Sequence, residues 1–206
     1  MRKIIFFLFV WVVASLSAFA QSAKEIVTRM EAEMEKHDND GVTLTVEIKI
    51  PIVGSFKSKV WQLGDNMRMD VMLVEPLNIS TWTDGTSTWI YNPADNEVKI
   101  SNGAAESNGD SKMFEDISNG YDVSIESQTS KSWTIACKKS KTNKDKDAPK
   151  KLELVIAKGT YYPVSMGFKQ SGVTVTMSDI SFGTKADEVI FNADNYPGVT
   201  IVDNRK

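Results

Sequence analysis

A stretch from Ile79 to Pro93 constrains the fold more than any other part of the chain. It reads Ile-Ser-Thr-Trp-Thr-Asp-Gly-Thr-Ser-Thr-Trp-Ile-Tyr-Asn-Pro, two runs of mostly β-branched and aromatic residues around Asp84-Gly85. Asp-Gly between two such runs is a strong hairpin signal, because glycine tolerates the positive φ that the favoured hairpin turns require. We therefore predict an antiparallel hairpin here, ended by Asn92-Pro93, in a protein built mainly of β-strands.

Alternation of apolar and polar residues continues on both sides of this hairpin. Every second residue is apolar from Val42 to Ile50, and again from Met67 to Leu73. Such alternation is typical of antiparallel strands with one face on the core and the other in water. Further strands are predicted at 56–63, 97–101, 121–127, 133–139, 152–157, 162–169 and 173–182, with short apolar runs at 189–191 and 199–201. The chain thus contains ten or eleven short strands.

Two segments are predicted to be helical. Residues 22–37 begin with Ser22 as N-cap and Glu25 three residues later, the pattern of a capping box. Residues 112–118 form a second, shorter candidate. A meander this long leaves an apolar face in water unless it closes or is covered. We therefore predict a mainly β protein, an incomplete (half) antiparallel β-barrel whose concave face is covered by the N-terminal helix and the short inserted helix.

The first twenty residues are predicted to be a cleaved signal peptide. A positive start, an apolar run from Ile4 to Val13 and an Ala18-Phe19-Ala20 site are typical of secretory signals. The run is shorter than the ~20 residues needed to span a bilayer. Gln21 follows the predicted cut, and a lipid anchor would need Cys there. We therefore expect residues 21–206 to form a single soluble domain in the periplasm.

The charge and the single cysteine exclude some classes of function. Without Arg2 and Lys3, 22 basic residues face 27 acidic ones, a net charge of −5. This balance argues against nucleic acid or an anionic membrane as the main partner. Cys137 can form no internal disulfide and shares its strand parity with Ile135, so we predict a buried core residue.

Enzyme chemistry has little support in the sequence. His37 is the only histidine and is interpreted as a solvated group at a helix end, so no Ser/His/Asp set or Cys/His pair is convincing. No Gly-rich phosphate loop, no cluster of metal-binding residues and no calcium loop occurs. A carboxylate pair for glycoside hydrolysis has no sequence pattern of its own, but no acidic residue interrupts an apolar strand face. We predict no enzyme, no cofactor and no metal site.

The predicted interior is rich in methionine. Thioethers adapt to irregular partners, which suits a promiscuous apolar site, although methionine is also ordinary core filler. A curved sheet too large to fill itself, closed by a light lid, favours a cavity for a hydrophobic ligand. The predicted lining is Leu44, Val46, Ile48, Met67, Met69, Val71, Met166, Phe168 and Met177. The predicted lid is Met30, Met34, Met113, Phe114 and Ile117.

Three features occur together in one known family. They are the hairpin Thr83-Asp84-Gly85-x-x-x-Trp89-Ile90-Tyr91-Asn92-Pro93, the order of signal peptide, amphipathic helix and alternating strand, and the closing segment Phe191 to Thr200 with its Pro197-Gly198-Val199. In these features the chain resembles the periplasmic lipoprotein carriers, the LolA-like proteins, over essentially all of residues 21–206.

The resemblance implies a monomeric carrier that binds no nucleotide. Such a carrier takes acylated lipoproteins from an inner-membrane ABC-type extractor, shields their acyl chains in the half-barrel and passes them to an outer-membrane acceptor. The family often has Arg-Pro between the second and third strands, where the Arg helps to hold the lid closed. Here Gly64-Asp65 occupies that turn, and the nearby Arg68 has outward parity. Relatives of this architecture also sense envelope stress, so the alternative is a lipid-sensing or regulatory protein-binding module.

Overall fold

The computed structural model describes residues 21–72, 78–103 and 114–205. The predicted signal peptide and the lid residue Met113 lie outside these ranges. One sheet contains the strands β1 (Val42–Ile50), β2 (Gly54–Leu63), β3 (Asn66–Met72), β4 (Ile79–Thr83), β5 (Ser87–Asn92), β6 (Glu97–Asn102), β7 (Tyr121–Gln128), β8 (Ser132–Lys139), β9 (Lys151–Ala157), β10 (Pro163–Gln170), β11 (Val173–Phe182) and β12 (Thr200–Asp203). The helices are α2 (Ala23–Glu35), α3 (Ile117–Gly120), α4 (Ala186–Val189) and the 3₁₀ helix η3 (Ala193–Asn195).

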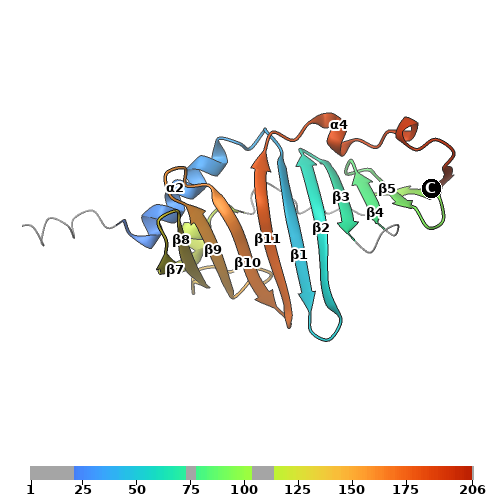
Figure 1. Ribbon diagram of the computed structural model, residues 1–206. Coiled ribbons are helices and arrows are strands. Elements are labelled where there is room, and N and C mark those ends of the chain that lie inside the picture. The colour runs from blue at the N-terminus through green and yellow to red at the C-terminus, as the bar shows by residue number, and fades with distance from the viewer. Residues whose placement is uncertain (1–20, 73–77, 104–113, 206) are drawn as a thin grey trace, which may run out of the picture.

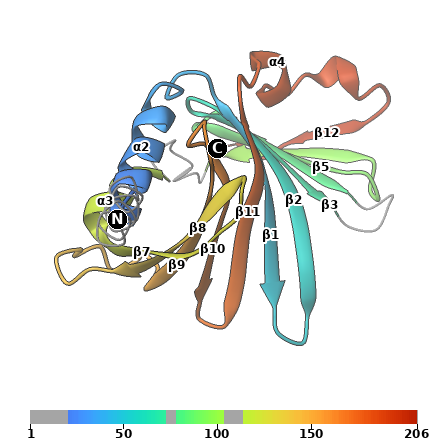
Figure 2. The same cartoon turned by 60° about the vertical axis from the view of Figure 1, so that its left-hand side comes forward.

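The strand order joins two meanders into one open sheet. The order is β12-β6-β5-β4-β3-β2-β1-β11-β10-β9-β8-β7, and every pair is antiparallel except β12 with β6. Pairing of β1 with β11 links the two meanders at the middle of the sheet (Figure 1). Figure 2 shows the sheet curving beneath α2 and α3 without closing. An open, curved sheet of 12 strands agrees with the predicted incomplete barrel and exceeds the predicted strand number.

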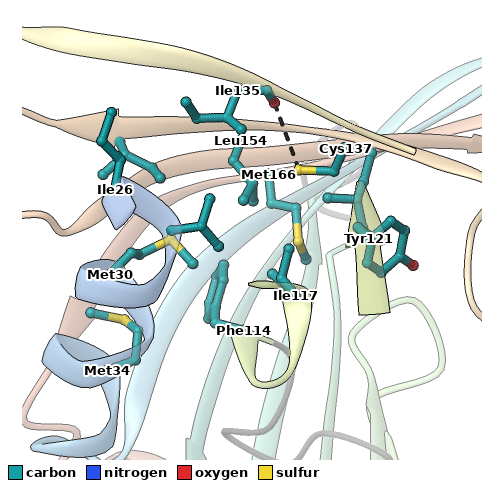
Figure 3. Close-up of a cluster of buried hydrophobic side chains, with 13 residues drawn as sticks. Ile26, Met30, Met34, Phe114, Ile117, Tyr121, Ile135, Cys137, Leu154 and Met166 are labelled. Atoms are coloured by element: carbon teal, nitrogen blue, oxygen red, sulfur yellow. Dashed lines mark hydrogen bonds between the residues drawn. The ribbon is translucent and has the colours of Figure 1, made fainter. Parts of the chain in front are cut away.

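Helix α2 begins where the sequence predicts. The Ser22 hydroxyl accepts a hydrogen bond from the Glu25 amide at 3.1 Å, which satisfies one of the free N–H groups of the first turn. The helix ends at Glu35, two residues before the predicted end. Its apolar stripe is buried against the sheet and comprises Ile26, Val27, Met30 and Met34 (Figure 3). We call the sheet face that α2 and α3 cover the inner face.

The firmly packed core lies on the inner face of β7 to β11. Leu154 on β9 is opposite Met166 on β10 and Ile135 on β8, and all three side chains are buried. Cys137 is buried in the same cluster, as predicted, and burial raises the pKa of its thiol to about 12. The stripe of α2 packs on this surface, so the helix covers one half of the sheet.

The inserted helix is shorter and later than predicted. The sequence predicts residues 112–118, whereas α3 spans Ile117–Gly120. Asp116 has φ of 56°, a left-handed conformation that cannot continue a helix from the preceding residues. Phe114 and Ile117 are nevertheless both buried against the core. A carboxylate oxygen of Glu31 on α2 accepts a hydrogen bond from the Ser118 amide at 2.8 Å and ties the two helices together.

The C-terminal segment covers the outer face of β4 and β5. Phe191 lies 5.4 Å from Trp82 and 6.0 Å from Trp89 between ring centroids, and Tyr196 lies 4.7 Å from Tyr91. The apolar run at 189–191 forms no strand, since α4 ends at Val189 and η3 begins two residues after Phe191. The side chain of Glu188 accepts a hydrogen bond from the Lys185 amide at the start of α4, which favours a helical turn over an extended chain.

Arg68 lies on this outer face, as its parity predicts. Its guanidinium is 4.8 Å from the centroid of Trp61 and 5.3 Å from that of Trp82, and it forms two hydrogen bonds with Asp70. It therefore takes no part in holding α2.

The hairpin between β4 and β5 forms with a shifted turn. The sequence predicts Asp84-Gly85 as the tip, but the tip is Gly85-Thr86, flanked by Asp84 and Ser87. The Asp84 carboxylate accepts hydrogen bonds from the amides of Thr86 and Ser87 at 2.8 and 2.7 Å. These bonds hold the pKa of the Asp84 carboxyl below its usual value of 3.8.

Candidate functional site

A cavity of about 220 Å³ lies between the C-terminal end of α2 and the inner face of β1 to β3. It is the part of the inner face that borders the helix-covered core without being filled by it. Its lining residues are Met34, His37, Asp38, Gly41, Val42, Leu44, Val46, Val60, Gln62, Gly64, Asp65, Met67, Phe114 and Phe182.

The floor of the cavity follows from strand alternation. Val42, Leu44 and Val46 are every second residue of β1 and therefore share one face. Leu44 is 4% exposed and pairs across the strands with Val60 of β2. Met67 of β3 continues the same surface beyond β2. The floor is therefore an apolar patch that spans three neighbouring strands.

The opposite side of the cavity comes from the helical segments. Met34, on the last turn of α2, and Phe114, just before α3, are both buried and both line the cavity. In Figure 3 the two side chains lie on the same side of the core cluster, below Met30. A flexible thioether and an aromatic ring thus separate the cavity from the packed core.

The polar residues of the cavity cluster where α2 turns into β1. The His37 ring is within hydrogen-bond distance of the Asp40 carboxylate at 2.7 Å and of the Tyr162 hydroxyl at 2.6 Å. It also stacks on Phe182, with ring centroids 4.5 Å apart. The interpretation of His37 as a solvated helix end is therefore wrong, because the side chain joins the chain after α2 to Tyr162, just before β10, and to Phe182 on β11.

Gly41 allows β1 to pass close to β2 at the edge of the cavity. Its φ is +67°, and a Cβ atom there would lie 2.5 Å from the carbonyl oxygen of Gln62. No other residue fits without moving that backbone. The close approach of the chain to β2 beside the cavity therefore requires glycine at position 41.

The predicted site residues fall into separate groups. Five of them line the cavity: Leu44, Val46, Met67, Met34 and Phe114. Five belong to the helix-covered core or pack against it: Met166, Phe168, Met177, Met30 and Ile117. Ile48 is 36% exposed beyond the cavity, Met69 is half-buried on β3, and Val71 borders a separate groove with Trp61 and Arg68.

Several lining residues were not predicted. Val42 and Val60 share the parity of the predicted lining, so the alternation of β1 and β2 carries the signal for them. Phe182 and Gln62 lie opposite Val42 on the two neighbouring strands, a placement that depends on the register of the sheet. His37 and Gly41 enter through the turn after α2, which has no periodic pattern.

The arrangement is suited to holding an apolar group. Within the described ranges, no group of three or more His, Cys, Asp or Glu side chains is placed to hold a metal ion. None of the helices that the structure describes is both long and apolar enough to cross a membrane. An apolar floor with polar residues at one end can hold a hydrophobic chain whose polar end stays in water.

Comparison with known proteins supports the fold. No protein-family profile and no curated protein sequence matches the chain. Among solved structures, the lipoprotein LppX of Mycobacterium tuberculosis matches with a TM-score of 0.51 and 11% identity, over 78% of this chain and 96% of LppX. LprF of Mycobacterium bovis matches with a TM-score of 0.51 and 10% identity, over 81% and 97% of the two chains. The chain has a LolA-like fold, which confirms the resemblance found in the sequence at the level of the fold.

Proposed function

We propose that this protein is a periplasmic carrier that binds the acyl chains of lipoproteins in the cavity between α2 and β1 to β3. The observation that carries the proposal is an apolar space of about 220 Å³ beside a packed core. An engineered apolar cavity of ~150 Å³ binds benzene, so the cavity of this protein is large enough to bind an apolar ligand. Burial of an acyl chain gains ~0.8 kcal/mol per CH₂ group.

The lining suits a guest with one polar end. Leu44, Val46 and Val60 supply an apolar surface, whereas His37 and Gln62 lie where the chain would meet water. A lipoprotein acyl chain has this composition, since it ends in an ester or amide next to a polar protein. The carrier therefore holds the chain by its apolar part and leaves the protein cargo outside.

Release depends on the helical side of the cavity. The proposed lid comprises Met30, Met34, Met113, Phe114 and Ile117. Because Met34 and Phe114 line the cavity, a small movement of the last turn of α2 would open it. Methionine side chains repack at low cost, which favours such a movement without an energy source. The proposed lining also includes Ile48, Met69, Val71, Met166, Phe168 and Met177. The site would extend to these residues when the lid is open.

The remaining parts of the proposal concern the route of the cargo. The protein would be secreted by cleavage of residues 1–20 and would act as a monomer of residues 21–206. It would receive acylated lipoproteins from an inner-membrane ABC-type extractor and deliver them to an outer-membrane acceptor, with no cofactor and no catalytic step.

The test combines ligand identification with one blocking variant. The protein is purified from the cell envelope and its bound lipids and lipoproteins are identified by mass spectrometry. Val60→Trp fills the cavity, and Val164→Trp makes the same substitution at a side chain that is 48% exposed. We expect acylated cargo on the native protein and on Val164→Trp but not on a folded Val60→Trp. A single stable protein partner without lipid would refute the carrier and favour the regulatory module.

A further inference from the structure

The turn between β1 and β2 is the only described hairpin turn with large apolar side chains at its tip. Ile52 is fully exposed and Val53 is 65% exposed. The other turns at this and the opposite end of the sheet have small or polar tips, such as Gly64-Asp65, Gly85-Thr86, Lys158-Gly159-Thr160 and Ser171-Gly172. Exposed apolar side chains at one tip of a water-facing protein point to a surface that covers them in use.

The tip has an unfavourable backbone conformation at the end of a regular hairpin. The β1–β2 ladder is continuous from Val42–Gln62 to the last pair, Ile50–Gly54, so the tip is a short turn on a long hairpin. Ile52 has φ of +72°, in the left-handed region that β-branched residues rarely adopt. Asn adopts this conformation more readily and would also expose a polar side chain to water. Stability and solubility alone therefore do not account for isoleucine at this position.

Lysine residues lie at the base of this tip, on the outer face of the sheet. Lys49 of β1 and Lys169 of β10 are both opposite Thr174 of β11, so the three residues form one row across the sheet. Neither lysine forms an ion pair among the residues that the structure describes. Lys57 of β2 has only a long contact of 3.9 Å with Glu47. The β1–β2 and β10–β11 turns lie at the same end of the sheet (Figure 1), so this end has a basic rim.

An apolar stripe connects the tip with the cavity. Val46, which lines the cavity, is followed on the same face of β1 by Ile48 and Ile50, and the strand then reaches Ile52. Ile48 is 36% exposed although it lies on the inner face. The stripe therefore leads from the exposed tip to the cavity along a single strand.

We propose that the β1–β2 tip inserts into an anionic lipid surface, with the lysines at its base contacting the headgroups. Lys49 precedes Ile52 by three residues, which at ~3.3 Å per residue of extended chain places its backbone at most roughly 10 Å from the tip. This separation matches the ~5–10 Å by which interfacial segments enter the acyl region. The inference goes beyond the proposed function, because docking requires only the tip and its rim and not an occupied cavity.

A reporter at the tip tests insertion directly. Ile52→Cys is labelled with the environment-sensitive fluorophore NBD, and Thr160→Cys, in the turn at the opposite end of β10, is the matched control. Native Cys137 is buried with its pKa raised to about 12, so it takes up little label. Vesicles contain phosphatidylglycerol and phosphatidylcholine in equal parts. We expect a blue shift and stronger emission at position 52 and no change at position 160.

Two variants separate the apolar and the charged parts of the contact. Ile52→Asn relieves the backbone conformation, so we expect equal or higher thermal stability together with at least about tenfold weaker vesicle binding in co-sedimentation. Lys49→Glu with Lys169→Glu should weaken binding to the anionic vesicles by more than tenfold but leave binding to pure phosphatidylcholine unchanged. Ser171→Asp, at the neighbouring polar tip, should change binding by less than either variant.

Three outcomes would overturn the proposal. They are an unchanged spectrum at position 52, full binding by Ile52→Asn, or self-association of the native protein that Ile52→Asn abolishes without any vesicle binding. Val60→Trp separates this proposal from the carrier function, because a blocked cavity should leave docking intact. If the native protein docks on vesicles but carries no acyl cargo, only the carrier function is refuted. If it carries acyl cargo but does not dock, only the role of the tip is refuted.

Discussion

The size of the cavity predicts how affinity depends on the length of a bound acyl chain. If ~150 Å³ holds the six carbons of benzene, then by proportion the cavity of about 220 Å³ holds roughly nine carbons. Each CH₂ group transferred into it gains ~0.8 kcal/mol, which is about a fourfold change in Kd. Nine carbons would give a gross gain of ~7 kcal/mol, reduced by the entropy lost on binding. The slope per carbon is less affected by that loss than the absolute affinity.

The assay is a series of saturated fatty acids of increasing length, each measured below its micelle concentration by displacement of a fluorescent fatty acid. We expect the logarithm of the affinity to rise linearly and then flatten at roughly nine carbons. Additional carbons would lie on Ile48 and Ile50, which are exposed and half-buried, so each would gain less. Val60→Trp should move the break to shorter chains, whereas Val164→Trp should leave it in place.

Two results would refute this reasoning. An affinity that does not depend on chain length would mean that the cavity is not the binding surface. A break that stays at the same length in a folded Val60→Trp variant would mean that the chain lies elsewhere on the inner face. A linear rise far beyond roughly nine carbons would instead require an opened lid and a larger site than the closed structure has.

Three further predictions concern the parts that shape the cavity. Gly41→Ala forces a side chain into a left-handed position and against the Gln62 carbonyl, so we expect the free energy of unfolding in urea to fall by ~2 kcal/mol or more. Unchanged stability would contradict the assigned approach of β1 to β2. Glu31→Ala removes the acceptor of the Ser118 amide and should cost ~1–2 kcal/mol, whereas Glu31→Gln retains an oxygen there and should cost less. Equal losses would refute the role of this bond. The pKa of the Cys137 thiol is 9.0 in the unfolded chain and is raised to about 12 by burial in the folded protein. The unfolded state therefore binds fewer protons between these pH values, so the free energy of unfolding should fall as the pH rises through them. A Cys137→Ala variant with the same decline in urea titrations would assign it to other groups.

Strand parity accounts for the part of the fold that the sequence predicts well. Alternation in β1 and β3 assigns Leu44, Val46 and Met67 to one face and Arg68 to the other, and the structure agrees. Parity is a local property of the extended chain and does not depend on how the strands are ordered in the sheet. It identifies a face, however, and says nothing about which neighbour covers that face.

The sequence pattern did not predict which strands of the inner face the helix covers. Helix α2 has 13 residues and so spans ~20 Å at 1.5 Å per residue, enough to cross roughly four strands spaced ~4.8 Å apart. Which four strands it crosses depends on the pairing of β1 with β11, two segments more than a hundred residues apart. Met166 and Met177 therefore share the parity of Leu44 yet belong to the packed half or its border. The apolar run at 189–191 also depends on tertiary packing, since Phe191 is half-buried against Trp82 and Trp89 and forms no strand.

The charge distribution favours a contact with membranes that is short-lived. The predicted mature chain has a net charge of −5, which an anionic surface repels as a whole. Lys49 and Lys57 lie within a few residues of the apolar tip, and Lys169 lies in the same row as Lys49, two strands away. Only charges within about one Debye length, ~8–10 Å, act strongly on the surface. Local attraction with global repulsion orients the protein tip first and still allows it to leave. If this reasoning is correct, moderate salt should change the affinity for anionic vesicles only slightly, because it screens both effects. A steep loss of binding with salt would show that the lysines dominate and that the net charge has no part in release.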